Sequence, residues 1–368
     1  MFHFFFYKTE GSAIMYNFVK YNFILIMEYL SPDSFLSEWL DIPIVDVRSP
    51  IEYSKGHITG AMNIPLFSNE ERAKIGAIYK QHGRLQAIQK GLEFVGPKMK
   101  NMAEIAGSLA RNHHLKVYCF RGGMRSEKMS WLFELVGISC YVLKGGFKAY
   151  RNLLIKDMAE MSNLIVLQGA TGSGKTDILS SLTKKGEQVI DLEGMAHHRG
   201  SAFGHIGMEE QPTSLQFQND VYMEIRKLDP KRRIWVEGES LSIGKVYLPE
   251  TLWESINRAP VVEISIPKEV RIKRLVRDYG SFDRELLIAS TQKISRKFGH
   301  NNVKDVIDCI REGDLHRAAS LLLDYYDKSY NFSKKKYKLR KPLKVESQSG
   351  DPQLNADLVL KKVKENLI

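Results

Sequence analysis

Eight consecutive residues, GATGSGKT from Gly169 to Thr176, constrain the fold of this chain more than any other segment. They match the pattern G-x4-G-K-[ST] and stand between an apolar run, LIVLQ, and a helical pattern, DILSSL. A glycine loop between a strand and a helix directs backbone N–H groups at phosphate oxygens, the lysine reaches an outer phosphate and the threonine can hold Mg²⁺. The expected phosphate ligands are Gly169, Gly172, Gly174, Lys175 and Thr176.

The P-loop motif leaves the identity of the phosphate compound open. A nucleotide is the default ligand, but a diphosphate group on another molecule presents similar oxygens. Acidic partners are expected from QVIDLEG, which contains Asp191 and Glu193, and from RRIWVEGES, which contains Glu237 and Glu239. We expect no tightly bound cofactor and no metal site apart from Mg²⁺ at Thr176.

Strand-like runs alternate with helical patterns along most of the chain. Short β-branched runs at 42–47, 115–119 and 140–143 precede the P-loop unit, and similar runs at 188–192, 233–237 and 261–266 follow it. Such alternation predicts parallel α/β sheets. A helix is expected from Met124, with Trp131, Leu132, Leu135 and Val136 on its apolar face.

The P-loop unit restarts the strand–helix pattern at Asn163, which predicts a domain boundary between 150 and 162. We expect an α/β domain over 27–152 and a P-loop α/β domain with a helical extension over 160–345. A tail helix is expected over 346–368. Residues 1–26 are interpreted as an over-extended or disordered N-terminus before a natural start at Met27.

Composition points to a globular, cytoplasmic protein with a polyanionic partner. Lys and Arg exceed Asp and Glu by 11, and three cysteines are too few for a disulfide framework. A basic excess favours nucleic acid because each neutralised phosphate releases counterions. The aromatic start is interrupted by Lys8, Glu10 and Lys20, and no apolar run reaches the ~18 residues that a membrane span needs.

The segment CFRGGMRS places Cys119 at the end of a strand and Arg125 at the start of a helix. Inward-facing amides of the loop and the positive end of the helix favour an anion. Together with Arg121 and Arg125 they are expected to lower the pKa of the thiol and produce a nucleophilic thiolate.

Three segments together resemble a rhodanese domain: DVRSPIEYSKGHITGAMNIP (46–65), YCFRGGMRS (118–126) and VLKGGFKAY (142–150). The resemblance covers about residues 35–152 and implies that the loop cysteine carries a persulfide or related chalcogen adduct. Asp46, Arg48, His57 and Gly60 match its framework. The C-x5-R loop is one residue longer than in common single-domain rhodaneses and also fits cysteine phosphatases, so the loop alone leaves phosphatase chemistry open.

Over residues 35–345 the chain resembles the tRNA 2-selenouridine synthase family. The segments that carry the resemblance are IYKQHGRLQAIQKG (78–91), CFRGGMRS, GATGSGKT, DLEGMAHHRGSAFG (191–204), QPTSLQFQN (211–219) and VEGES (236–240). The family implies two reactions on a wobble uridine of tRNA. Geranyl diphosphate first alkylates 2-thiouridine on sulfur, and selenophosphate then supplies selenium to give 2-selenouridine. The implied partners are tRNA and the enzyme that supplies selenophosphate, with no DNA and no membrane.

On this resemblance, Cys119 is expected to carry selenium as an S-selanyl adduct. The selenophosphate is expected to be held by Arg121, Gly122, Gly123, Arg125 and Ser126. The P-loop is expected to hold the diphosphate of the geranyl donor, or a nucleotide. The residues alone decide neither selenium over sulfur nor which tRNAs are substrates.

Several features have a less specific interpretation. The basic run SKKKYKLRKPLK (333–344) is interpreted as a tRNA contact, with a solvated surface as the alternative. His197, His198, Arg199 and His205 are interpreted as a substrate loop rather than a metal site. Cys140 and Cys309 are expected in the core. The competing functions are a phosphatase fused to a kinase and a non-catalytic tRNA-binding or sulfur-relay protein.

Overall fold

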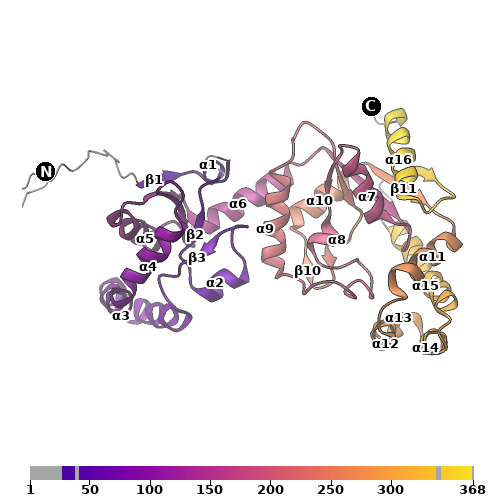
Figure 1. Ribbon diagram of the computed structural model, residues 1–368, viewed down its shortest axis with the longest axis horizontal. Helices are drawn as coiled ribbons and strands as arrows, with labels where there is room; N and C mark the ends of the chain where they lie inside the picture. Colours follow the sequence, from indigo (N-terminus) through magenta and orange to yellow (C-terminus); the bar gives the residue numbers. More distant parts are fainter. Residues whose placement is uncertain (1–26, 38–40, 337–340, 367–368) are drawn as a thin grey trace, which may run out of the picture.

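The computed structural model describes residues 27–37, 41–336 and 341–366. Two lobes follow one another along the chain, and each is built on a five-stranded parallel sheet (Figure 1). The expected α/β class, with a rhodanese-like first part and a P-loop second part, is confirmed.

The first sheet has the strand order β1-β5-β4-β2-β3. Its strands are β1 (Met27–Leu30), β2 (Ile44–Asp46), β3 (Met62–Asn63), β4 (His114–Tyr118) and β5 (Ser139–Leu143). Val45, Val117 and Val142 have no exposed surface, since the central strands of a parallel sheet are covered on both faces. The helices are α1 (Pro32–Ser37), α2 (Pro50–Lys55), α3 (Asn69–Val95), η1 (Gly96–Lys98), α4 (Met99–Leu109), α5 (Met124–Leu135) and α6 (Gly146–Ala159).

Helix α5 buries a different face from the one expected. Trp131 and Leu135 are exposed, as is Val136 just after the helix, whereas Met129 and Phe133 are buried with Leu132. The cause is the cysteine loop, because Ser126 must face the Cys119 thiol at the first turn. Met129 and Phe133, three and seven positions after Ser126, lie on the same face of the helix as Ser126. This rotation of the helix about its axis directs them at the sheet.

The second sheet has the order β12-β11-β6-β8-β7. Its strands are β6 (Leu164–Gly169), β7 (Gln188–Ile190), β8 (Ile234–Glu237), β11 (Val261–Ser265) and β12 (Leu343–Glu346), and a separate hairpin joins β9 (Ser242–Ile243) to β10 (Val246–Tyr247). The first helices are α7 (Lys175–Lys184), α8 (Leu192–Met195), α9 (Ser214–Ile225), α10 (Glu250–Arg258) and α11 (Lys268–Tyr279). A helical extension follows, made of α12 (Arg284–Lys293), α13 (Ser295–Phe298), α14 (His300–Glu312) and α15 (Leu315–Lys336).

The final helix α16 (Pro352–Asn366) belongs to the second lobe rather than forming a tail. It packs on α7, and its Val359 and Val363 are fully buried in one core with Val345 of β12. The tail helix expected over 346–368 is therefore part of the P-loop core as far as Asn366, because its apolar face packs with the edge strand β12.

The two lobes share a hydrophobic core that passes through α6. Phe147, Tyr150 and Leu154 of α6 are in one buried cluster with Phe217 and Tyr222 of α9. Figure 1 shows α6 running from the first lobe to the second, where α9 and α10 receive it. Burial of this surface ties the two sheets to one another.

Two of the sequence expectations concern residues outside the described ranges. The interpretation of residues 1–26 lies wholly outside them, and the basic run at 333–344 lies partly outside them, at 337–340. The end of that run is strand β12. Among the described residues, no helix is long and apolar enough to cross a bilayer.

Candidate active sites

Cys119 follows the last residue of β4 and is only 3% exposed. Ser126 Oγ lies 3.3 Å from Cys119 Sγ and 3.0 Å from the carbonyl oxygen of Gly123. The thiol therefore sits inside the loop, beneath the backbone that connects β4 to α5.

The pKa of the Cys119 thiol is lower than usual. Burial raises it, but the Ser126 hydroxyl and the backbone N–H groups of Ser126, Arg121 and Gly123 hydrogen-bond the sulfur and outweigh burial. Hydrogen bonds to the charged form stabilise a thiolate. The direction agrees with the sequence expectation, whereas the groups responsible are amides and a hydroxyl rather than guanidinium groups.

The two loop arginines have other contacts. Arg125 Nη1 donates to Glu52 Oε2 at 2.8 Å, and Glu52 also lies 3.7 Å from Arg72 Nε. Arg121 lies over the ring of Phe120, which is 37% exposed. Arg125 thus holds the loop against α2, and Arg121 is exposed to solvent.

Glycines are required where the cysteine loop meets the start of α6. Gly122 has φ +63°, and a Cβ there would lie 2.6 Å from the Leu143 carbonyl oxygen. Gly146 has φ +61°, and a Cβ there would lie 2.4 Å from the Cys119 carbonyl oxygen. The backbone N–H of Phe147 donates to that same oxygen at 2.8 Å. Two backbone segments therefore touch with no room for side chains.

The framework residues lie behind the loop. Asp46 and Arg48 form a buried bidentate ion pair, and Arg48 also donates to the Gly56 carbonyl oxygen at 2.7 Å. The Arg48 guanidinium stands 4.0 Å from the centre of the Phe147 ring. His57 stacks on Tyr53 3.8 Å away. These contacts do not involve the thiol.

The P-loop connects β6 to α7. Gly172 and Gly174 have φ +79° and +78°, and Lys175 Nζ lies 3.4 Å from the Gly169 carbonyl oxygen. Helix α11 covers the loop, because Arg271 donates to the Thr171 carbonyl oxygen at 3.1 Å and Arg274 pairs with Asp177. These contacts tie the P-loop and the first turn of α7 to α11.

The acidic residues expected near the P-loop occupy different depths. Asp191 and Glu239 line the cavity, while Glu237 is fully buried and accepts from the backbone N–H of Leu192 at 3.0 Å. Burial, with Glu193 nearby and Lys175 opposing, raises the pKa of Glu239 to about 8. Burial followed by the charges of Asp191 and Glu193 raises the pKa of Glu237.

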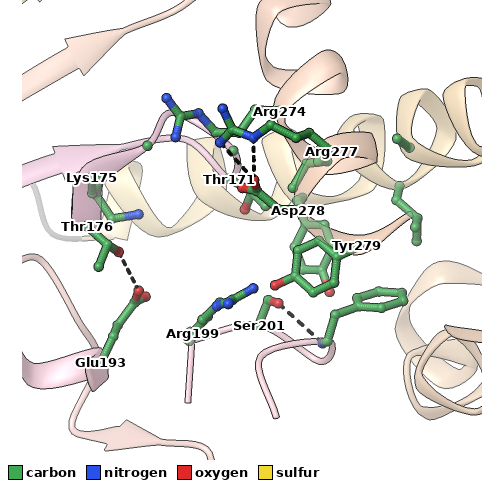
Figure 2. A pocket seen from close by; sticks show the side chains of 18 of the residues that line it. Thr171, Lys175, Thr176, Glu193, Arg199, Ser201, Arg274, Arg277, Asp278 and Tyr279 are labelled. Atoms are coloured by element: carbon green, nitrogen blue, oxygen red, sulfur yellow. Dashed lines mark hydrogen bonds and ion pairs between the residues drawn. The ribbon is translucent and has the colours of Figure 1, made fainter. Parts of the chain in front are cut away.

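A cavity of about 750 Å³ extends from the P-loop into the helical extension. Figure 2 shows Lys175, Thr176 and Glu193 on one side, Tyr279 and Ser201 on the other, and Arg199 between them. Away from the P-loop the wall combines the rings of three tyrosines with apolar side chains; the lining residues are Tyr279, Tyr326 and Tyr330, with Phe203, Met208, Leu275, Leu287, Ile310, Leu315, Ala318, Ala319 and Leu322.

Three cavity residues were absent from the predicted site. Glu193, weighed with Asp191 in the sequence, is the carboxylate that meets the P-loop, with Oε2 3.1 Å from Thr176 Oγ1. Arg199 enters from the predicted substrate loop and lies 5.5 Å from the centre of the Tyr279 ring. The segment DLEGMAHHRG carried a signal for the first two, whereas nothing near Tyr279 marked it as a cavity residue.

The oxygen atoms around Thr176 suit Mg²⁺. Thr176, Glu193 and Glu239 present hard oxygen ligands beside the P-loop. Among the described residues no three or more His, Cys, Asp or Glu side chains are grouped to hold a metal. An ion at this place would also need phosphate oxygens and water.

Comparisons with known proteins match both lobes. A model of the tRNA 2-selenouridine synthase AAA domain matches residues 162–350, and a model of the rhodanese-like domain matches residues 34–153. The tRNA 2-selenouridine synthase of Bdellovibrio bacteriovorus is 39% identical over 293 residues, which cover 77% of this chain and 73% of that protein. That of Bordetella petrii is 37% identical over 336 residues, 80% of this chain and 88% of the relative.

Proposed function

Because this chain belongs to the tRNA 2-selenouridine synthase family, we propose that it converts 2-thiouridine in tRNA to 2-selenouridine in two steps. The P-loop cavity transfers a geranyl group to sulfur, and the cysteine loop then delivers selenium. The protein would act in the cytoplasm with an enzyme that supplies selenophosphate.

The hydrocarbon wall of the P-loop cavity is the observation that carries the first step. Tyr279, Tyr326 and Tyr330 offer hydroxyl groups in this cavity, but Phe203, Leu287, Ile310 and Leu322 offer only hydrocarbon. That balance suits an isoprenoid chain better than a nucleobase, which needs hydrogen-bonding partners around its edge. A diphosphate at the P-loop would continue directly into an apolar chamber. Geranyl diphosphate has this combination of a charged head and a hydrocarbon chain.

Geranyl transfer makes a carbon–sulfur bond and breaks a carbon–oxygen bond. The sulfur of 2-thiouridine attacks C1 of the geranyl group, and diphosphate leaves with the bonding electron pair. The P-loop amides and Lys175 stabilise the charge that develops on the leaving group. Mg²⁺ held by Thr176 and Glu193 would supply further charge neutralisation when bound.

The S-selanyl adduct expected on Cys119 has a redox consequence. If the thiolate took selenium itself, phosphorus would be reduced and phosphite would leave. If the thiolate attacks phosphorus, the S–P bond forms, the P–Se bond breaks and selenium leaves as selenide, with no change of oxidation state. The amide-lined C-x5-R loop suits a phosphoryl group, and we therefore assign Cys119 this second role.

Selenide released beside Cys119 then attacks C2 of the S-geranyl uridine. A carbon–selenium bond forms, the carbon–sulfur bond breaks, and geranyl thiolate leaves with the electron pair and takes a proton from water. Water hydrolyses the phosphocysteine to phosphate and restores the thiolate. Alkylation in the first step is what makes sulfur an adequate leaving group in the second.

Nucleoside mass spectrometry separates the two steps. With 2-thiouridine tRNA, geranyl diphosphate and selenophosphate, wild type should form 2-selenouridine and Cys119→Ser should accumulate the S-geranyl nucleoside. Lys175→Ala should slow geranylation roughly 100-fold, the loss typical of one oxyanion-stabilising group. It should still convert tRNA that already carries the S-geranyl group.

Three results would contradict the proposal. Unchanged tRNA in the presence of wild type that binds it would refute the function. If Lys175→Ala retained both steps at the wild-type rate, geranyl diphosphate would not be the ligand of the P-loop. If mass spectrometry of the trapped intermediate showed the isotope pattern of selenium on Cys119 instead of a phosphoryl group, the S-selanyl adduct would be the correct intermediate.

A further inference from the structure

Helix α3 carries a long stretch of one charge sign. From Arg72 to Leu92 the sequence has no Asp or Glu, and it contains Arg72, Lys74, Lys80, Arg84 and Lys90. A solvated helix usually intersperses the two signs, since pairs three or four residues apart stabilise it. A block of one sign is instead suited to a polyanion.

The middle of α3 is a corner that stands in solvent. Gly83 has φ +84° and ψ −174°, so two helical arms meet there, and a Cβ at Gly83 would touch nothing within 4 Å. The second arm packs back on the first, with Gly91 against Phe67 and Ile75. The corner is thereby held rigid while its outer surface is left uncovered.

The residues around this corner are exposed and chemically mixed. Lys80, His82 and Arg84 are exposed, and Tyr79 and Leu85 are 59% and 64% exposed. No ion pair to Lys80 or Arg84 occurs within the part of the chain that the structure describes. Cations beside an aromatic ring are the groups that contact RNA backbone and stack on unpaired bases.

The first arm of α3 begins beside the cysteine loop. The backbone N–H of Ile51 in α2 donates to Asn69 Oδ1 at 2.8 Å, and Glu52 lies between Arg72 and Arg125. From Arg72 to Gly83 the helix extends about 16 Å at 1.5 Å per residue. A basic track therefore leads outward from the catalytic thiol to the corner.

We propose that the outer surface of α3, from Arg72 to Lys90, binds the arm of the tRNA that carries the modified uridine, with phosphates on Lys80 and Arg84 at the corner. The proposal rests on the proposed function for the identity of the RNA. The corner holds the stem while the loop of that arm reaches Cys119. A protein partner is disfavoured because the exposed Tyr79 and Leu85 stand among charged and polar side chains and form no continuous apolar patch.

The test compares two charge reversals of equal size. Lys80→Glu/Arg84→Glu changes the α3 corner, and Lys361→Glu/Lys364→Glu changes two exposed lysines on α16. Affinity for 2-thiouridine tRNA is measured by fluorescence anisotropy over a range of salt. The α3 variant should bind at least about tenfold more weakly, with a salt slope smaller by about 2, and the α16 variant should bind like wild type.

Further measurements keep the result interpretable. Lys80→Gln/Arg84→Gln should show the same reduced slope with a smaller loss of affinity, and both α3 variants should raise KM for tRNA with little change in kcat. Equal binding by the α3 and α16 variants, with wild type still modifying tRNA, would overturn this inference and leave the function standing. Wild type that binds tRNA through α3 but never modifies it would refute the function instead.

Discussion

Cys119 and Ser126 are seven residues apart, one after β4 and the other in the first turn of α5. The Ser126 hydroxyl and three backbone N–H groups lower the pKa of the thiol, while Arg125 is engaged by Glu52. At this scale, reactivity depends on short hydrogen bonds inside the loop rather than on the net charge around it. A C-x5-R loop can therefore activate its cysteine with its arginine otherwise occupied.

Replacing Ser126 with alanine should raise the pKa of Cys119. Losing a hydrogen bond of about 1 kcal/mol to the thiolate should slow alkylation by iodoacetamide at neutral pH roughly fivefold. The reaction is followed by mass spectrometry over a range of pH. Ser130→Ala, one turn further along α5, is the control and should react like wild type. A pH profile that is the same in both variants would show that the amides alone set the pKa.

Glycine placement matters at the scale of elements, where the cysteine loop and the start of α6 pack backbone to backbone. Gly146 and Gly60 both have positive φ, but only Gly146 has backbone atoms within 3 Å of the position of a Cβ. Alanine substitutions at the two positions therefore separate the free-energy cost of a positive φ from the cost of the close backbone contact.

Gly60→Ala should lower the free energy of unfolding by about 1 kcal/mol, the cost of placing a side chain in the left-handed region. Gly146→Ala should cost roughly 3 kcal/mol or more, since the loop must also move, and should reduce the alkylation rate of Cys119. Urea denaturation and alkylation measure the two effects. Equal destabilisation by both substitutions would mean that the cysteine loop moves away from a side chain at position 146 at no cost in free energy.

The two lobes are joined at the scale of the whole molecule by α9. Asn219, fully buried, donates to the His57 carbonyl oxygen at 2.8 Å and accepts from Arg151 Nη1 at 2.7 Å. The backbone N–H of His57 donates to Gln216 at 2.9 Å, and Thr59 donates to Asp220 at 2.6 Å. The rhodanese-type loop at 56–60 thus serves as a docking edge for the P-loop lobe.

Asn219→Ala should leave the His57 carbonyl and the Arg151 guanidinium without this partner. The expected cost is about 2–4 kcal/mol, concentrated at the joint. Wild type should unfold in one calorimetric transition and the variant in two, because the sheets no longer unfold together. Asn302→Ala, which removes one exposed hydrogen bond in α14, is the matched control. A single transition in both variants would show that the apolar core around α6 alone couples the lobes.

The sequence by itself determined the strand–loop–helix units, the parallel α/β class and the positions of both loops. Those features depend on neighbours within a few residues, such as the glycines around Lys175 and the apolar runs before each loop. The family resemblance added the expected chemistry. Local patterns were sufficient here because backbone geometry and hydrogen bonding in such loops are short-range.

Only the tertiary structure decided which distant residues complete each site. Glu193 meets Thr176, Glu52 engages Arg125, and the distant helices α11, α12, α14 and α15 supply most of the hydrocarbon wall of the P-loop cavity. The buried face of α5 was also decided there, because the contact between Ser126 and Cys119 set the rotation of the helix. These outcomes depend on packing between segments far apart in the chain, which no local periodicity encodes.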